Sequence, residues 1–312
     1  MASLSSCEEH TAMTSTGISS LFKPEQLAPV RSVSLRARLI VEGMIAGLHK
    51  SPYHGFSAEF LEYRPYSYGD AVRRIDWRKY AKTDRTVVKL FEDETNLYAH
   101  LLVDKSGSMA FGTKGLLSKH EYARTLAASL AWILVRQRDA VGLALFDSSL
   151  NTFIPPRSTN VQLKTILAHL QAVEPGGPTG CADSLHEVAR MVNKRGLCIL
   201  VSDFFDDPDR IIDGLRHLRF KRQDVVAFWV ADPFELEFAR RGSLKLRDLE
   251  SGEEVVLDGE TASHFYREGF AGHRERLVKA CRELRVDLEI VSVREPFQKA
   301  LLRTLEKRGR LY

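Results

Sequence analysis

The fold of this chain is indicated by one stretch, which reads Ala99-His100-Leu101-Leu102-Val103-Asp104-Lys105-Ser106-Gly107-Ser108-Met109. A short apolar run ends at Asp104, and two serines follow it at alternate positions, Ser106 and Ser108. Such a run is typical of a buried strand in an α/β sheet, where ligands bind at the carboxyl ends of the strands. Carboxylate and hydroxyl oxygens suit hard cations. We therefore predict a divalent metal site, for Mg²⁺ or Mn²⁺, at this strand end. A cluster of turn and helix-capping residues is the alternative interpretation.

The Asp-x-Ser-x-Ser pattern resembles the metal-ion-dependent adhesion site of von Willebrand factor type A domains. That family completes the site with a threonine from a later loop and an aspartate at the end of the fourth strand. The resemblance implies Thr179, which follows Gly176-Gly177-Pro178, and Asp203, which follows a second apolar run. Pro178 is a departure, since the family usually reads Gly-Gly-Thr. The full set of expected metal ligands is Asp104, Ser106, Ser108, Thr179 and Asp203.

The composition argues against several classes of protein. The chain has 312 residues and a formal net charge of +4, with its basic residues dispersed, so nothing demands nucleic acid as a partner. No apolar run is long enough to cross a bilayer, and the N-terminus lacks a secretion signal. The cysteines are scattered, at Cys7, Cys181, Cys198 and Cys281. Such scattered cysteines are typical of proteins in a reducing compartment, so we expect a cytoplasmic protein. The lack of a long apolar run predicts that it has no integral membrane segment.

Hydrophobic periodicity divides the chain into three parts. Residues 1–23 are rich in Ser and Thr and predict a disordered tail. Residues 24–96 form an N-terminal segment that we expect to pack on the core. It begins with a helical pattern whose apolar stripe comprises Leu35, Leu39, Met44 and Leu48 and whose Arg36 lies on another face. Residues 97–312 alternate strands with helices, which predicts a doubly wound, mostly parallel α/β sheet with helices on both faces. The resemblance makes this domain von Willebrand type A-like.

Two local features modify this alternation. An edge strand is expected over 151–154, and Pro155-Pro156 is expected to end it because proline lacks an N–H group. A β-hairpin is predicted within about residues 236–258, where turn residues lie between two arms of alternating apolar residues. The hairpin is either a recognition arm or an ornament at the edge of the domain.

A long signature lies before the first strand of the sheet. It reads Gly55…Glu59-Phe60…Arg64-x-Tyr66-x-x-Gly69-Asp70-x-x-Arg73-Arg74-Ile75-Asp76-Trp77, and Phe111-Gly112…Lys119 follow the serines. This pattern is similar to that of the bacterial family called domain of unknown function 58, whose members carry a von Willebrand type A-like domain. Members of that family often accompany MoxR-type AAA+ ATPases. The resemblance therefore implies such an ATPase, or its client protein, as a partner.

The signature mixes arginines, aspartates and aromatic residues. A guanidinium can pair with a carboxylate and stack on a ring, so this mixture suits a binding surface. The candidates for binding a partner are Arg64, Tyr66, Asp70, Arg74, Asp76 and Trp77. The alternative role is structural, with ion pairs that hold the segment to the sheet.

Two functions of different kinds are compatible with these residues. The first is non-enzymatic: a metal-dependent adaptor or co-chaperone of a MoxR-type ATPase, since this chain has no Gly-x-x-x-x-Gly-Lys-Ser/Thr phosphate loop. The second is a Mg²⁺-dependent phosphohydrolase of the haloacid dehalogenase type, in which Asp104 is the nucleophile and Asp203, Asp206 or Asp207 holds the metal. Ser106 stands where that class has its second aspartate, so the general acid is missing. We therefore favour the first function and expect no catalytic residues.

Overall fold

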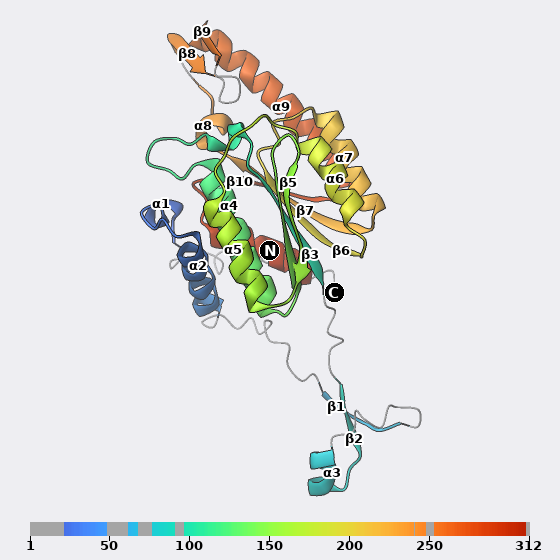
Figure 1. Cartoon of the computed structure of the whole chain (residues 1–312). Coiled ribbons are helices and arrows are strands. Elements are labelled where there is room, and N and C mark those ends of the chain that lie inside the picture. Colours follow the sequence, from blue (N-terminus) through green and yellow to red (C-terminus); the bar gives the residue numbers. More distant parts are fainter. Residues whose placement is uncertain are drawn as a thin grey trace, which may run out of the picture. The chain divides into compact units, whose positions relative to one another are not determined.

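The chain divides into two compact units. A computed structural model describes residues 22–48, 62–67, 77–90, 97–239, 241–247 and 253–309 (Figure 1). The first unit comprises residues 1–52 and 97–312, and the second comprises residues 53–96. The predicted tail at 1–23 lies outside the described residues except for Phe22 and Lys23.

The first unit is built on a six-stranded sheet, in the order β10-β7-β6-β3-β4-β5 (Figure 1). Its strands are β3 (Tyr98–Asp104), β4 (Ala140–Phe146), β5 (Leu150–Arg157), β6 (Gly196–Ser202), β7 (Gln223–Ala231) and β10 (Asp287–Ser292). Strand β5 pairs antiparallel with β4 at one edge, and the other neighbouring strands are parallel. The predicted fold class, a mostly parallel α/β sheet between helices, is confirmed.

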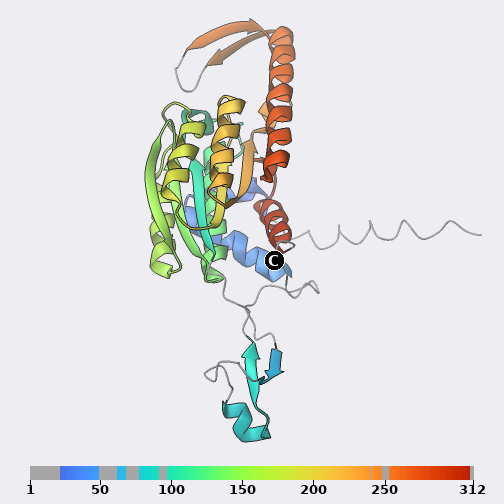
Figure 2. The same cartoon turned by 90° about the vertical axis from the view of Figure 1, so that its right-hand side faces the viewer.

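Helices cover both faces of this sheet (Figure 2). One face carries α2 (Val33–Leu48), α4 (Lys119–Arg136), α5 (Asn160–Ala172) and α10 (Phe297–Gly309). The opposite face carries α6 (Cys181–Met191), α7 (Pro208–Phe220) and α9 (Gly259–Leu284). Successive residues of β3 alternate between the two cores, because side chains of a strand point to opposite faces. Leu101 and Val103 belong to the first core, and Leu102 belongs to the second.

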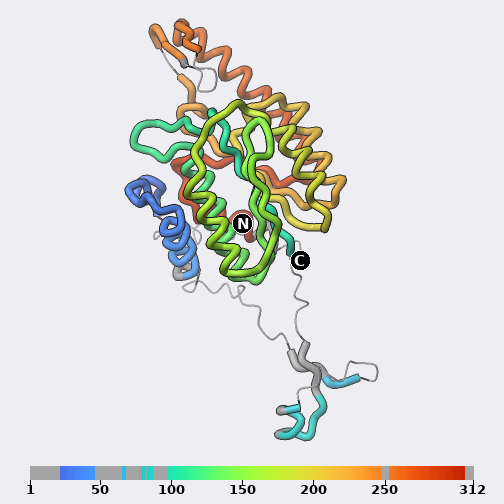
Figure 3. The backbone as a smooth tube through the Cα atoms, viewed as in Figure 1, coloured from blue at the N-terminus to red at the C-terminus, as the bar shows by residue number. Residues whose placement is uncertain are grey.

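Helix α2 belongs to the first unit and packs along α4 (Figure 3). The apolar stripe expected from the sequence is partly wrong, because Leu35 is 47% exposed. Met44 of the expected stripe is buried, and α2 also buries Val33, Ala37, Ile40 and Val41 against the core. The sequence therefore predicted the helix correctly and its buried face in part.

The expectation that Arg36 lies away from the buried face of this helix is also wrong. Its side chain is 1% exposed. The guanidinium donates to the carbonyl groups of Val30 and Ala28, and it pairs with Glu121 of α4 at 3.3 Å. A buried charge is tolerated when it is paired and hydrogen-bonded, so Arg36 joins the turn before α2 to the start of α4.

Strand β5 continues through Pro155-Pro156 to Arg157, so the prediction that the prolines end it is wrong. The ladder between β4 and β5 shifts register between Val141 and Leu143, opposite these prolines. Proline is tolerated at a bulge or on an edge strand, where its missing N–H leaves no ladder bond unmade. The expected edge position of this strand is confirmed, and the register shift opposite the prolines lets it extend further than expected.

The predicted hairpin is present, formed by β8 (Ser243–Arg247) and β9 (Glu254–Asp258) in antiparallel pairing. It projects beyond the sheet together with the N-terminal part of α9 (Figures 1 and 2). The side chains of β9 are exposed along the whole strand. The short helix α8 (Pro233–Leu236) joins β7 to this arm. Within the described ranges, every helix is too short or too polar to span a membrane.

The second unit contains β1 (Glu62–Pro65) paired antiparallel with β2 (Val87–Leu90), and α3 (Trp77–Thr83). Trp77 is 57% exposed and meets Tyr80 edge to face. Arg64 lies in β1 and Tyr66 directly after it. The other candidate partner-binding residues, Asp70, Arg74 and Asp76, lie outside the described residues. The binding role of this signature, and its packing on the core, stay predictions.

Candidate functional site

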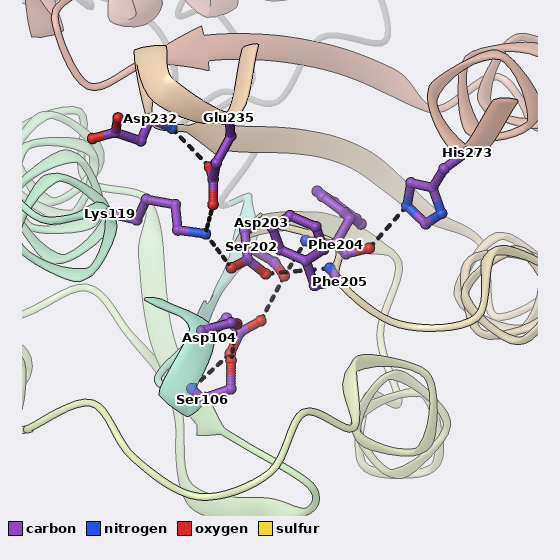
Figure 4. A network of polar contacts seen from close by, with 11 residues as sticks. Asp104, Ser106, Lys119, Ser202, Asp203, Phe204, Phe205, Asp232, Glu235 and His273 are labelled. Atoms are coloured by element: carbon purple, nitrogen blue, oxygen red, sulfur yellow. Dashed lines mark hydrogen bonds and ion pairs between the residues drawn. The ribbon is translucent and has the colours of Figure 1, made fainter. Parts of the chain in front are cut away.

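The candidate site begins where two neighbouring parallel strands end. Strands β3 and β6 are parallel neighbours, and Val103 lies opposite Val201. The next residues of the two strands, Asp104 and Ser202, therefore lie side by side at the carboxyl edge of the sheet. The Ser202 hydroxyl donates to Asp104 Oδ2 at 2.6 Å, and the Ser106 amide donates to Oδ1 at 2.8 Å (Figure 4). Asp104 is buried. Its carboxylate is therefore held in one orientation by neutral donors.

The two serines of the pattern lie together in the turn after β3, which is a short 3₁₀ helix at Gly107–Ala110. Ser106 is buried and Ser108 is half-buried, and their hydroxyl oxygens are 3.1 Å apart. The sequence pattern therefore brings a carboxylate and two hydroxyls to one turn at the carboxyl edge of the sheet, and their role as metal ligands stays a prediction.

The loop that carries Thr179 is tied to this turn by main-chain hydrogen bonds. The Gly107 amide donates to the Gly177 carbonyl at 2.8 Å, and the Gly176 amide donates to the Lys105 carbonyl at 2.7 Å. Gly177 has φ +84, a conformation that glycine adopts without strain. These bonds fix the approach of the loop even though Pro178 interrupts the usual Gly-Gly-Thr pattern.

Asp203, the last of the expected metal ligands, binds a lysine instead. Lys119 Nζ lies 2.7 Å from Asp203 Oδ2 and 2.5 Å from Glu235 Oε1 (Figure 4). The side chains of Lys119 and Asp203 are 1% and 0% exposed. Burial alone lowers the pKa of Lys119, but the two carboxylates outweigh it and raise the pKa above its usual value. The ammonium group therefore stays charged inside the domain.

Negative charge at this edge is only partly compensated. Burial, together with repulsion from Asp203, raises the pKa of Asp104 to about 7, although hydrogen bonds from Ser202 and Ser106 oppose the shift. Burial also raises the pKa of Glu235, against the attraction of Lys119. The ammonium group of Lys119 is thus shared by the carboxylates of Asp203 and Glu235. The carboxylate of Asp104 accepts hydrogen bonds from neutral donors instead. A bound cation would stabilise the ionised form of Asp104.

The turn that follows β6 is strained and firmly held. Phe204 has φ 55, which is uncommon for a residue with a large side chain. Its amide donates to Ser202 Oγ at 2.9 Å, and its carbonyl accepts from His273 Nε2 of α9 at 3.0 Å (Figure 4). Its ring is buried beside Trp229. Such conformations persist when their surroundings fix them, so the backbone after Asp203 is preorganised.

The residues present fit a small hard cation in part. Asp104, Ser106 and Ser108 supply carboxylate and hydroxyl oxygens on one turn, which are ligands for Mg²⁺ or Mn²⁺. Both oxygens of Asp203 already accept hydrogen bonds, from Lys119 Nζ and from the Phe205 amide. Among the described residues, no group of three or more His, Cys, Asp or Glu side chains could hold a metal. A cation here would therefore depend on the serine hydroxyls.

Lys119 and Glu235 are the members of this site that sequence reasoning missed. Two signals could have found them. A positive charge in the first turn of a helix interacts unfavourably with the helix dipole. Because Lys119 is the first residue of α4, an acidic partner is expected for its ammonium group. Asp232 and Glu235 form a capping box around Pro233 at the start of α8, which predicts where the chain turns after β7. Neither signal says that the two residues meet.

The strand order, and the carboxylate and hydroxyl groups that follow β3, define an α/β protein with a candidate metal site at the carboxyl edge of its central sheet. The chain belongs to the family described as protein of unknown function DUF58, whose model matches residues 62–277. The uncharacterized protein Rv1480 of Mycobacterium tuberculosis (strain ATCC 25618 / H37Rv) is 29% identical over 267 residues, which are 83% of this chain and 82% of that protein. The uncharacterized protein MAV169 of Mycobacterium avium is 28% identical over 139 residues, 42% of this chain and 79% of that protein.

Solved structures with similar folds include the conserved hypothetical protein BatB from Bacteroides thetaiotaomicron. That likeness has a TM-score of 0.46 and 17% identity, and it covers 69% of this chain and 99% of that chain. The SpRpn10 VWA domain gives a TM-score of 0.40 and 10% identity, over 66% of this chain and 94% of that domain. Both likenesses concern the fold alone.

Proposed function

We propose that this protein is a metal-dependent protein-interaction module. The observation that supports the proposal is the buried Asp104 carboxylate, which accepts hydrogen bonds from neutral donors beside the paired hydroxyls of Ser106 and Ser108. When bound there, Mg²⁺ or Mn²⁺ would supply an open coordination position for an acidic side chain of a partner. Ser108 is half-buried, so the site lies within reach of the surface.

The residues that would hold the cation are Asp104, Ser106, Ser108 and Thr179. Asp104 supplies the negative charge, and the serines supply neutral oxygens. Thr179 would be supplied by the loop whose Gly176 and Gly177 form main-chain hydrogen bonds with the residues after β3. The carboxylate of Asp203 would stay paired with Lys119, and its negative charge would attract the cation without direct coordination. Few negative ligands would leave the cation electrophilic toward a partner's carboxylate.

The proposed partner is a MoxR-type AAA+ ATPase or a client protein of that ATPase, for which this chain is an adaptor or co-chaperone. Support comes from the resemblance of the signature Arg64–Trp77 to its family, and from the lack of a phosphate-binding loop in this chain. ATP hydrolysis would then be supplied by the partner. The exposed Trp77 offers an aromatic contact of the kind that is enriched at protein interfaces.

A phosphohydrolase role for Asp104 is less well supported. Both carboxylate oxygens of Asp104 already accept hydrogen bonds, which makes them less available as a nucleophile. Ser106 cannot replace the general acid of that mechanism. Mg²⁺-dependent hydrolysis of p-nitrophenyl phosphate that is lost in Asp104→Asn would favour the enzyme over the interaction module.

The proposal is tested by capture of a purified MoxR-type ATPase on the immobilised full chain, with Mg²⁺ or with EDTA. We expect capture with Mg²⁺ alone, and loss of capture in Ser106→Ala/Ser108→Ala. Ser148→Ala/Ser149→Ala is the matched control, because these serines are exposed in the neighbouring turn between β4 and β5. Capture that is equal with EDTA and Mg²⁺, or equal in all variants, would contradict a metal-dependent interaction.

A further inference from the structure

A cleft of about 580 Å³ opens between α8, α9 and β10, next to the candidate site, with which it shares Glu235. Its apolar lining includes Leu236 of α8, Phe270 of α9 and Ile290 of β10, each half-buried. A cleft of this size and lining can hold a large apolar side chain and the backbone around it. All three elements belong to the first unit.

One wall of the cleft carries unpaired positive charge. Arg267 and Arg274 lie two turns apart on α9, both line the cleft, and both are exposed. Arg267 Nε donates to the carbonyl of Ser263, and neither guanidinium forms an ion pair among the residues that the structure describes. Elsewhere on the same helix, Arg276 pairs with Asp209 at 2.5 Å. The two cleft arginines are therefore free to bind an anionic group.

The acidic residue in the cleft does not cancel this charge. Glu235 lines the cleft, but its carboxylate lies 2.5 Å from Lys119 Nζ. The negative charge of Glu235 is thus directed inward, to a buried ammonium group, and the two arginines dominate the outer wall. The potential across the cleft favours a ligand with carboxylates.

Tyr266 provides a third polar group. It lines the cleft, and its hydroxyl oxygen is buried with no hydrogen-bond partner in the described part of the chain. Burial and the nearby Glu235 raise the pKa of this phenol, which keeps its proton and so remains a donor. A buried donor without an acceptor costs free energy, and an acceptor on a bound ligand would remove that cost.

We infer that the cleft between α8, α9 and β10 binds an acidic peptide segment of a partner protein that carries one large apolar side chain. Carboxylates of the segment pair with Arg267 and Arg274, and one of its acceptors receives the Tyr266 hydroxyl, which binding turns from its buried position toward the cleft. The apolar side chain packs on Phe270 and Ile290. This site requires no metal, so it is independent of the proposed metal-dependent interaction.

The test is fluorescence anisotropy of the full chain with a fluorescein-labelled peptide, Gly-Asp-Glu-Leu-Asp-Glu-Gly, in EDTA. We expect saturable binding that weakens about tenfold or more in Arg267→Glu/Arg274→Glu, because two charge pairs become repulsive. Arg282→Glu/Arg294→Glu changes net charge equally at exposed arginines that do not line the cleft, and we expect its affinity within about twofold of the parent. Circular dichroism verifies that each variant is folded.

Two further arms separate specific binding from general attraction. Tyr266→Phe removes only the hydroxyl, and we expect affinity to fall about threefold to tenfold, the range for one hydrogen bond. A peptide with Gly in place of Leu should bind more weakly to the parent. Absence of saturable binding, or equal weakening in both double-arginine variants, would overturn the inference.

Discussion

Lys119 Nζ lies 2.7 Å from Asp203 Oδ2, and both side chains are buried at the carboxyl edge of the sheet. The two residues are separated by 84 positions in the sequence. The same ammonium group contacts Glu235 of α8 and lies 4.7 Å from the centre of the Phe205 ring. The ammonium group of Lys119 therefore connects three elements of the domain: α4, the end of β6, and α8 at the base of the hairpin.

Replacing Lys119 with methionine should destabilise the domain by about 3–5 kcal/mol, because Asp203 and Glu235 would be left buried without their cation. The measurement is the free energy of unfolding in urea. Lys245→Met is the matched control, since its pair with Glu254 is 63% and 46% exposed and should contribute less than about 1 kcal/mol. Equal losses in both variants would mean that the buried ion pair has no special role.

Gly180→Ala should disturb the loop that carries Thr179. An added Cβ at Gly180 would lie 2.5 Å from Ser148 Cα and 2.8 Å from the Ser148 carbonyl oxygen, both backbone atoms. We expect a loss of about 1–3 kcal/mol in unfolding free energy and weaker metal binding. Gly176→Ala is the control, because its Cβ meets nothing within 4 Å. If Gly180→Ala binds Mn²⁺ as the parent does, the expected dependence of metal binding on this loop is contradicted.

Acid should destabilise the domain through His100 of β3. Burial lowers the pKa of His100 from 6.5 to about 4, so between these values the unfolded chain binds a proton that the folded chain does not. The stability that the neutral imidazole contributes is complete above pH 6.5 and is lost as the pH falls toward 4, by roughly 3 kcal/mol in all.

The check is the free energy of unfolding of His100→Phe between pH 4.5 and 7. Phenylalanine keeps an aromatic ring beside Phe153 and cannot titrate, so the pH slope of stability should decrease by up to about 1.4 kcal/mol per pH unit. The same substitution at the exposed His169 provides the comparison. An unchanged slope in His100→Phe would assign the acid sensitivity to other groups.

The features predicted correctly from the sequence are those that depend on local patterns. The strands β3 and β6 were predictable because buried parallel strands are continuous apolar runs, and their polar ends had to share one edge of the sheet. The hairpin β8–β9 followed from alternation around a turn. Asp104, Ser106 and Ser108 came together because they lie on one turn.

The features that were missed depend on contacts between distant residues. Lys119 and Glu235 are 116 positions apart, and a capping pattern at either residue does not identify its partner. The burial of Arg36 depends on Glu121 of another helix, and a helical period alone cannot tell a buried arginine from an exposed one. Pro155-Pro156 were misjudged, although an edge strand was expected, because the register shift that accommodates them depends on the pairing of β5 with β4.

The central claim is that Asp104, Ser106 and Ser108 hold a divalent cation. The most direct test is a titration of Mn²⁺ into the purified full chain, with free Mn²⁺ followed by electron paramagnetic resonance. We predict saturable binding by the parent and by Ser148→Ala/Ser149→Ala, and its loss in Ser106→Ala/Ser108→Ala. Binding that is absent from the parent, or unchanged when Ser106 and Ser108 are replaced, would contradict the claim.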